Sequence, residues 1–234
     1  MATPAVRIVR ILCALAAMLL GPIAARADGI PNNTVRIGEY WIWLDVHAND
    51  LTGPFVPPGV GLDVKNITTP FFSYLRRLST HFTVELAAGV PPLAKTVGKG
   101  PAMIGTAPYD GAEIATARWF APTLLLEYLF LDDSSALRPY IGVGLNYAYF
   151  YDCKSTAAGE AVAGGPTRIE LPASVGPAAT VGFSYRLPHH ASIGASYSAA
   201  RVGTHLTATT GDIVRTSTIN FNPTTLVIAV GMSF

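Results

Sequence analysis

Large apolar residues occupy every second position along much of the chain. The clearest run is Arg138–Tyr151, where bulky residues alternate with mostly small ones. The bulky positions are Ile141, Val143, Leu145, Tyr147, Tyr149 and Tyr151, and the positions between them are Gly142, Gly144, Asn146, Ala148 and Phe150. A period of two is typical of a β-strand with one apolar face. Because the other face is mostly small, we expect the bulky face to point outward, away from a narrow interior.

The same alternation, broken by turn residues, predicts eight strands. We expect them at residues 34–46, 64–77, 82–90, 113–130, 138–151, 174–187, 191–207 and 220–234. The connections alternate between long loops and short turns. The expected loops are 47–63, 95–111, 152–172 and 208–216, and the expected turns are 78–81, 131–137 and 188–190. Bacterial outer-membrane barrels have an even number of strands, with short periplasmic turns and long external loops. The pattern therefore predicts an all-β, antiparallel, up-and-down transmembrane barrel with both termini in the periplasm.

The composition favours a membrane protein over a soluble one. Hydrophobic residues make up 50% of the chain and charged residues 13%, whereas soluble domains carry about 25% charged residues. Beyond the N-terminal segment there is no apolar run long enough for a spanning helix. Backbone groups in lipid must be paired internally, which leaves a closed barrel as the spanning structure. A soluble exported β-domain is the alternative that the pattern leaves open.

The N-terminal residues 1–27 have the features of a secretory signal peptide. Arg7 and Arg10 precede an apolar run, Ile11–Ala25, which leads to the cleavage pattern Ala25-Arg26-Ala27. An uncleaved anchor is the rival interpretation, but the run is short for a spanning helix. Cleavage would leave one domain, residues 28–234, with one cysteine and a slightly acidic charge. This balance gives no indication of nucleic-acid binding.

Aromatic residues fall into two predicted belts at the ends of the barrel. The belt near the short turns contains Phe82, Tyr128, Phe130, Tyr185 and Phe234, and the belt near the loops contains Phe120, Tyr149, Tyr151 and Phe221. Aromatic girdles at both interfaces are typical of membrane barrels.

Three segments resemble the OmpW family of outer-membrane proteins. They are Ala121–Phe130 (APTLLLEYLF), Leu137–Tyr147 (LRPYIGVGLNY) and the terminal Val230–Phe234 (VGMSF). The resemblance covers nearly all of residues 28–234 and implies an eight-stranded barrel with a narrow, hydrophobic lumen that passes small hydrophobic molecules. It also implies that the terminal strand, with Val230, Met232 and Phe234, is read by the barrel-assembly machinery. Pro70 in the second expected strand departs from the family pattern.

Six residues are candidates for lining or gating the lumen. Alternation points the charged Glu85, Glu127 and Arg186 inward, and Arg36 with them, while Tyr140 and Asn146 come from the family-like segment. If Phe82 pairs near Phe130, Glu85 lies opposite Glu127, and Arg186 approaches from across the lumen. Such a cluster is either a structural ion group that plugs the barrel or a gate, and the sequence leaves both open.

Together with the strand pattern, the family resemblance therefore implies a narrow outer-membrane channel for small hydrophobic solutes. A non-conducting barrel whose external loops bind a partner is the alternative. An enzyme that cleaves acyl esters is disfavoured, because the pair His190 and Ser192 lacks an orienting acid near Thr204 and His190 falls in a periplasmic turn. No cofactor, metal site or nucleic-acid partner is expected, and outer-membrane lipid is the expected surrounding.

Overall fold

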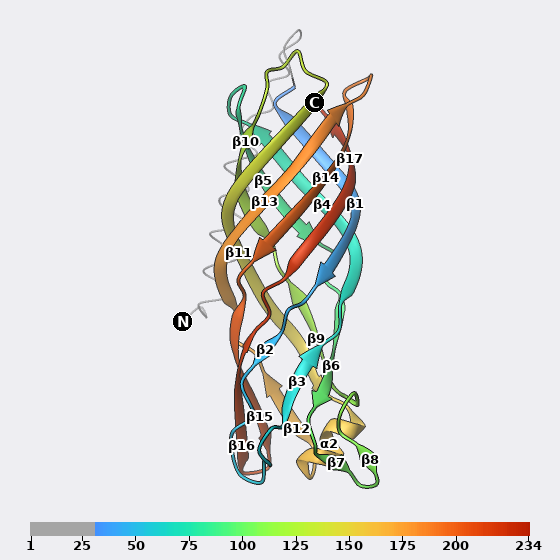
Figure 1. Cartoon of the computed structure of the whole chain (residues 1–234), viewed down its shortest axis with the longest axis vertical. Coiled ribbons are helices and arrows are strands. Elements are labelled where there is room, and N and C mark those ends of the chain that lie inside the picture. Colours follow the sequence, from blue (N-terminus) through green and yellow to red (C-terminus); the bar gives the residue numbers. More distant parts are fainter. Residues whose placement is uncertain (1–30) are drawn as a thin grey trace.

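The computed structural model describes residues 31–234, so the expected signal peptide lies outside the described residues. Eight long strands form a closed antiparallel barrel (Figure 1). In the order of their pairing they are β10 (Thr123–Leu129), β5 (Phe82–Gly89), β4 (Ile67–Arg77), β1 (Asn33–Trp43), β17 (Thr224–Ser233), β14 (Ala191–Ala200), β13 (Ser174–Arg186) and β11 (Leu137–Ser155), which pairs with β10. The predicted fold is confirmed.

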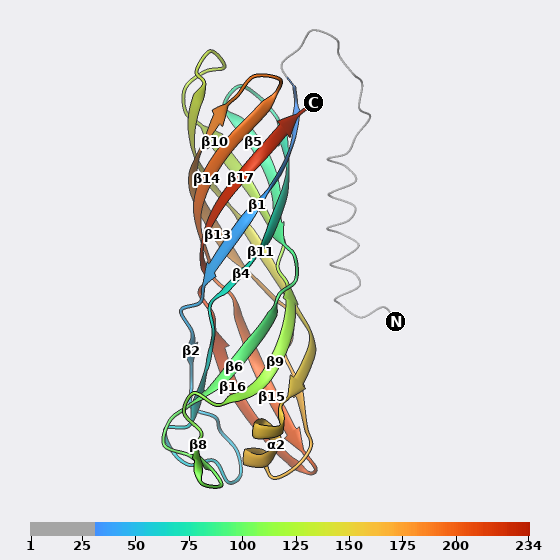
Figure 2. The same cartoon turned by 90° about the vertical axis from the view of Figure 1, so that its right-hand side faces the viewer.

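The first and last strands close the barrel. Strand β1 pairs antiparallel with β17 from Thr34 opposite Ser233 to Trp43 opposite Thr224. Beyond this ladder Phe234 donates its N–H to the carbonyl of Asn33 over 2.9 Å. The described chain therefore begins and ends beside the short turns, as Figure 2 shows for the C-terminus and the start of β1. Every strand has a partner on both sides, which is what a spanning sheet requires in lipid.

The outer surface of the barrel is apolar, as predicted. Ile141, Val143 and Leu145 are at least half exposed, whereas Gly142 and Asn146 on the other face of the strand are buried. The structure also decides the face of β1, where Val35 and Ile37 point outward and Arg36 points inward. Tyr147 is an exception, because it lies on the outward register yet is only 6% exposed.

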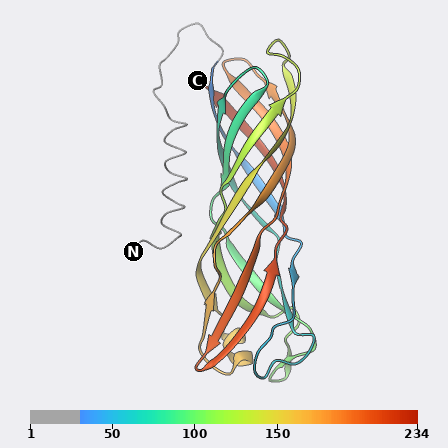
Figure 3. The ribbon, with the colours of Figure 1, turned by 90° about the vertical axis from the view of Figure 1, so that its left-hand side faces the viewer.

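Most of the long connections contain strands or a helix, so the prediction of loops there is wrong, except that residues 49–60 belong to no strand or helix, as expected. The barrel wall continues past the membrane-spanning strands as further sheet (Figures 1 and 3). This extension contains β2 (His47–Ala48), β3 (Gly61–Val64), β6 (Leu93–Lys99), β7 (Met103–Ile104), β8 (Ala107–Pro108), β9 (Glu113–Phe120), α2 (Ala157–Ala163), β12 (Thr167–Glu170), β15 (Gly203–Thr210) and β16 (Ile213–Asn220). Its strands are rich in threonine and alanine, which can form ladders without the strong apolar alternation that marks a lipid-facing strand.

Prolines mark where the barrel meets this extension. The expected strand 113–130 is interrupted at Ala121-Pro122, and the expected strand 220–234 is interrupted at residues 221–223, which end in Pro223. Proline has no N–H to donate to a ladder, so strands break or bulge there. Pro70 stays inside β4, next to the point where the ladder between β4 and β5 ends at Phe71 opposite Gly89. Within residues 31–234, no helix has the length and apolar character needed to cross a membrane.

Close strand packing requires glycine at Gly144. A Cβ added there would lie 1.8 Å from the carbonyl oxygen of Leu124 on the neighbouring strand. Contacts this short force the backbone apart. Gly61 is a matched comparison, because it lies in a strand and a Cβ there would meet no atom within 4 Å.

We predict that Gly144→Ala lowers the free energy of unfolding by about 1–3 kcal/mol, because two paired strands must separate to admit the methyl group. Gly61→Ala is expected to leave stability unchanged. Urea titration of the protein folded in lipid vesicles, followed by tryptophan fluorescence, measures both. Equal midpoints for the two variants would contradict the predicted clash.

Candidate functional site

A layer of charged and aromatic side chains crosses the lumen in the half of the barrel nearer the short turns. Arg36 on β1 places Nη1 3.6 Å from Oε1 of Glu85 on β5, and both side chains are nearly buried. Glu127 on β10 lies beside Glu85 and is 1% exposed. The ring of Tyr140 on β11 faces the guanidinium, with Cζ of Arg36 5.8 Å from the ring centroid. We call these four residues the polar layer.

Small residues on the lumen face make room for the polar layer. A Cβ at Gly231 would lie 3.1 Å from Cγ of Arg36, and one at Gly142 would lie 3.2 Å from Cγ of Glu127. At Gly182 it would lie 2.7 Å from the Tyr140 ring. An eight-stranded barrel has an interior that side chains just fill. The inward glycines thus leave space for large inward side chains on neighbouring strands. The expectation that small residues fill the lumen holds only between these large side chains.

The sequence placed the two carboxylates correctly inside but misjudged their register. Phe82 pairs with Tyr128, two residues from the expected partner Phe130. Glu85 therefore lies opposite Leu125, and Glu127 lies opposite Thr83, so that the carboxylates are diagonal neighbours. Diagonal positions on one face of a sheet remain within reach of long side chains.

Arg186 does not join the polar layer, and this part of the prediction is wrong. It lies at the mouth of the barrel beside the short turns, where Nη1 donates to the backbone oxygen of Asp133 over 2.8 Å. The carboxylate of Asp133 binds Arg138, over 2.8 Å, and Arg77. The turn between β10 and β11 thus holds Arg186 at the mouth. Arg36 supplies the cation of the polar layer instead.

A polar vestibule opens at this mouth. Its volume is about 520 Å³, and its lining includes Arg36, Arg77, Arg138 and Arg186 together with His190. Beside it, hydrogen bonds from the hydroxyl and N–H of Ser134 lower the pKa of the Asp132 carboxyl. The four arginines in its lining make the vestibule basic, and Arg36 belongs both to this lining and to the polar layer.

Beyond the polar layer, toward the extension, lies an apolar chamber of about 90 Å³. Its lining includes Tyr40, Ile42, Phe71, Leu125 and Val227, with Glu85 also among the lining residues. Asn146 lines it too and donates through Nδ2 to Oγ1 of Thr123 over 2.8 Å and to the carbonyl of Ala121 over 3.2 Å. Asn146 thereby fixes the start of β10 where the chain leaves Pro122.

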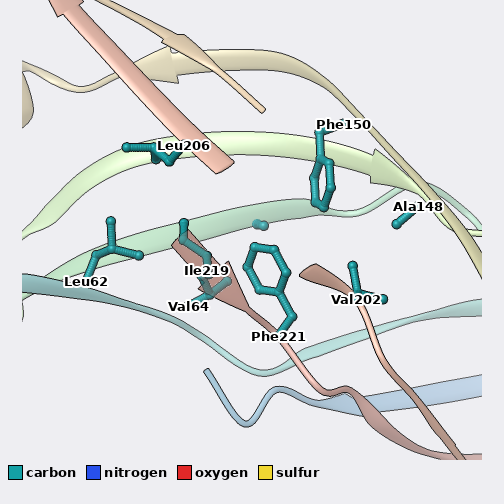
Figure 4. Packing of buried hydrophobic residues seen from close by; sticks show 9 residues of the cluster. Leu62, Val64, Ala148, Phe150, Val202, Leu206, Ile219 and Phe221 are labelled. Carbon is teal, nitrogen blue, oxygen red and sulfur yellow. The ribbon is translucent and has the colours of Figure 1, made fainter. Parts of the chain in front are cut away.

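Two aromatic rings narrow the lumen at the end of this chamber that faces the extension. The rings of Phe150 and Phe221 lie 5.7 Å apart, and Figure 4 shows them among Leu206, Ile219 and Val202. Phe221 was expected in the lipid-facing belt, but it is buried, because the break before Pro223 turns its segment inward. We call Phe150 and Phe221 the aromatic constriction.

Two further apolar cavities continue the path outward. A small cavity of about 30 Å³ shares Phe150 and Phe221 with the chamber and shares Leu62 and Leu206 with an outer cavity of about 120 Å³. In the outer cavity the Tyr109 hydroxyl donates to the carbonyl of Gly61 over 3.1 Å, and burial raises the pKa of Tyr109 to about 12. An interrupted apolar path thus runs from the outer end to the polar layer.

The barrel wall has an unpaired interval beside the apolar chamber. The ladder between β5 and β10 ends at Ala87 opposite Thr123, and that between β6 and β9 begins at Leu93 opposite Arg118. Residues 88–92 and 119–122, which include Pro91, Pro92 and Pro122, form no ladder with each other. Gly89, Pro92, Trp119 and Ala121 on the two sides of this interval line the chamber.

His190 and Ser192 lie at the vestibule rim, at the short-turn end. His190 is exposed and has a left-handed backbone, φ 60°, within the turn before β14. Within residues 31–234 no group of three or more His, Cys, Asp or Glu residues is arranged to hold a metal ion. The inward aromatic residues Tyr40, Phe71 and Phe221 were missed from the sequence, although alternation along β1 and β4 carries the signal for the first two.

Comparison with known proteins agrees with this architecture. The OmpW family model matches residues 35–234. Outer membrane protein W of Vibrio cholerae is 27% identical over 95% of this chain and 97% of that protein. The crystal structure of OprG from Pseudomonas aeruginosa has a TM-score of 0.78 at 24% identity, covering 87% of this chain and 96% of that one. The structure of AlkL in lipid bilayers has a TM-score of 0.64 at 20% identity, covering 91% and 95%.

A closed eight-stranded barrel with an apolar outer surface defines an outer-membrane β-barrel protein, and the protein lies in the lipid of the bacterial outer membrane. The chain belongs to the OmpW family, whose model covers nearly all of the described residues.

We predict that Arg36→Gln lowers the free energy of unfolding by about 3 kcal/mol, because Glu85 and Glu127 stay buried without their cation. Glu85→Gln added to that variant should restore much of the loss. Urea titration in lipid vesicles gives the four corners of the double-mutant cycle. Arg168→Gln, which breaks an exposed pair with Glu170, is the matched control and should cost less than about 1 kcal/mol. Strictly additive losses would rule out coupling within the polar layer.

Proposed function

We propose that this protein passes small apolar solutes across the outer membrane. The observation that carries the proposal is the series of apolar cavities that share lining residues, from the outer cavity through the aromatic constriction to the chamber. A soluble apolar core of this size would be packed to near-crystal density. A row of apolar spaces along the axis of a barrel suits a guest that is itself apolar.

The polar layer blocks the straight route toward the short turns. An apolar solute that entered it would have to separate Arg36 from Glu85 or lie against buried charge, and both cost free energy. We therefore propose that the polar layer is a structural floor and that Glu85, Glu127 and Arg36 support the chamber without gating it. Tyr140 packs on Arg36 as part of that floor.

The unpaired wall interval supplies a sideways exit. Segments 88–92 and 119–122 both contribute to the chamber wall, and their backbones do not pair with each other. Widening this interval therefore breaks no ladder bond between them, although the hydrogen bond from Arg118 Nη1 to the Pro91 carbonyl joins its two sides. The prolines at Pro91, Pro92 and Pro122 have no N–H to satisfy when it widens. With the short turns facing the periplasm, an apolar solute would enter from outside, reach the chamber and leave into the hydrocarbon layer.

The aromatic constriction controls the rate in this scheme. The cavity it bounds is only about 30 Å³, so a solute passes when Phe150 or Phe221 rotates aside. Side-chain rotation of this kind is fast compared with barrel opening. The lipid-facing Phe183, which is 45% exposed, offers the same side chain outside the path.

We predict that Phe150→Ala raises the uptake rate of a neutral apolar fluorophore several-fold, because it widens the narrowest cavity. Phe183→Ala, the matched control, should leave the rate unchanged. Uptake is measured in Gram-negative cells that lack their own OmpW-family protein and keep an intact lipopolysaccharide layer. If cells with the wild-type barrel and with Phe150→Ala take up the probe no faster than cells with an empty vector, the passage proposal fails.

We also propose that Val230, Met232 and Phe234 guide assembly by the barrel-assembly machinery. All three are more than half exposed. Val230 and Met232 lie on the outward face of β17 and Phe234 directly follows that strand, next to β1, where a partner can reach them before the barrel closes. Their backbone bonds to β1 do not depend on the side chains.

We predict that Phe234→Ser lowers the amount of barrel assembled in cells several-fold while leaving refolding of purified protein into detergent unchanged. Phe130→Ser, in the same expected aromatic belt, is the control and should reduce assembly less. Heat-modifiable electrophoretic mobility of outer-membrane fractions measures assembly. An equal loss for both variants would point to a general interfacial effect of aromatic rings.

A further inference from the structure

A buried arginine lies beside the outer cavity without an acidic partner. Arg215 on β16 is 8% exposed and lines the outer cavity and a second, more open cavity next to Gly164 and Gly211. Neither lining contains an Asp or Glu residue. Within residues 31–234, no salt bridge includes Arg215, although nine other ion pairs form.

The contacts of Arg215 are all with neutral oxygens. Nε donates to the carbonyl of Pro54 over 3.2 Å, Nη2 to the carbonyl of Ala163 over 3.3 Å, and Nη1 to Oγ1 of Thr210 over 3.4 Å. A guanidinium has five N–H donors and keeps its charge at every physiological pH. Ala163 ends α2, so the helix dipole offsets part of the charge. A buried positive charge with donors to spare nevertheless favours a bound anion.

The rest of the outer cavity is mostly apolar, with a few neutral polar residues such as Thr96, Ser155 and Thr167. Leu51, Val56, Leu62, Leu206 and Ala208 contribute to its wall. Arg215 is the one side chain in that lining that carries a permanent charge. A greasy pocket with a single cation at its edge matches a ligand with an alkyl chain and one anionic head.

A strained turn covers the guanidinium. Gly53 has φ 137° and Phe55 has φ 61°, and the carbonyl between them, that of Pro54, accepts from Arg215. Backbone in this region is costly for a residue other than glycine, and such strain collects at ligand sites. Phe55 is 86% exposed and lines both cavities, so its ring lies at the entrance to the outer cavity.

We propose that the outer cavity binds an amphipathic carboxylate, with its head on Arg215 and its alkyl chain toward Leu62 and Leu206. A carboxylate accepts two parallel N–H bonds from a guanidinium, which supplies both charge and direction. Leu62 and Leu206 also line the small cavity that the aromatic constriction bounds, so the alkyl chain of the ligand points into the apolar path. The inference rests on the proposed function for the fate of the ligand, but binding itself is independent of passage.

The rival explanation is that Arg215 only joins the turn at Pro54, helix α2 and the hairpin of β15 and β16. A structural arginine would be indifferent to the charge of any guest in the cavity. A ligand-binding arginine would discriminate a carboxylate from an alcohol or an amine of the same length. The charge of the probe therefore separates the two roles.

The test uses residues 28–234 in nanodiscs of zwitterionic lipid, with octanoate, 1-octanol and octylamine as probes that stay monomeric in water. Chemical shifts of the Arg215 Nε–H and the Gly164 amide report binding at this site and ignore probe dissolved in lipid. We expect octanoate to saturate these shifts with an apparent Kd at least about tenfold below that of 1-octanol, and octylamine to cause no saturable shift. Equal affinity for the three probes, or no saturable shift with octanoate, overturns the proposal.

Two variants test the assignment to Arg215. Arg215→Gln should abolish the preference for octanoate, followed at the Gly164 amide, while Arg168→Gln, a change at an exposed arginine of the same end, should preserve it. If Arg215→Gln does not fold, the wild-type series of three probes still decides the question. Loss of octanoate binding in Arg168→Gln as well would assign the effect to general surface charge and refute the site.

Uptake measurements keep this inference separate from the proposed function. Octanoate binding with no uptake of the neutral probe would leave the site standing and reject the passage. Uptake of the neutral probe with no octanoate preference would leave the passage standing and reject the site.

Discussion

The closing ladder between β1 and β17 is the interaction on which the rest of the structure depends. A strand surrounded by hydrocarbon must find backbone partners on both sides, so the sheet has to close. Closure after eight strands gives an interior that side chains just fill. From that follow the inward glycines, the large side chains that occupy the space they leave, and a lumen in which Arg36 and Glu85 form an ion pair inside the barrel.

The sequence predicted the features that lipid imposes and missed those that lipid does not reach. Along a barrel strand, successive side chains face lipid and lumen in turn, so outward Ile141, Val143 and Leu145 alternate with small residues. This alternation allowed the strands and the fold to be predicted. Much of the extension, for example Thr167–Glu170, carries no such contrast, and that segment was expected to be part of a loop. Register also lay beyond reach, because a shift of two residues keeps each face unchanged. Glu85 and Glu127 were therefore placed inside correctly but opposite each other wrongly.

The placement of Arg186 illustrates a further limit. Alternation shows which way a side chain points but not how high it lies along the axis, and a strand tilted around a barrel moves its last residues to the rim. Arg186 ends β13 at the mouth, where the turn at Asp133 binds it together with Arg77 and Arg138. Arg36 lies further inside, level with Glu85, and its charge is neutralised there.

The contrast between Arg36 and Arg215 organises the polarity of the whole molecule. Both guanidiniums are buried, but Arg36 has carboxylates of the chain beside it and Arg215 has backbone and hydroxyl oxygens alone. A buried charge neutralised within the protein makes a closed floor, because separating the pair leaves two uncompensated ions. A buried charge that has no counter-ion within the protein favours the binding of an anion from outside. The apolar cavities lie between these two arginines, which places the residue suited to capture at one end and the barrier at the other.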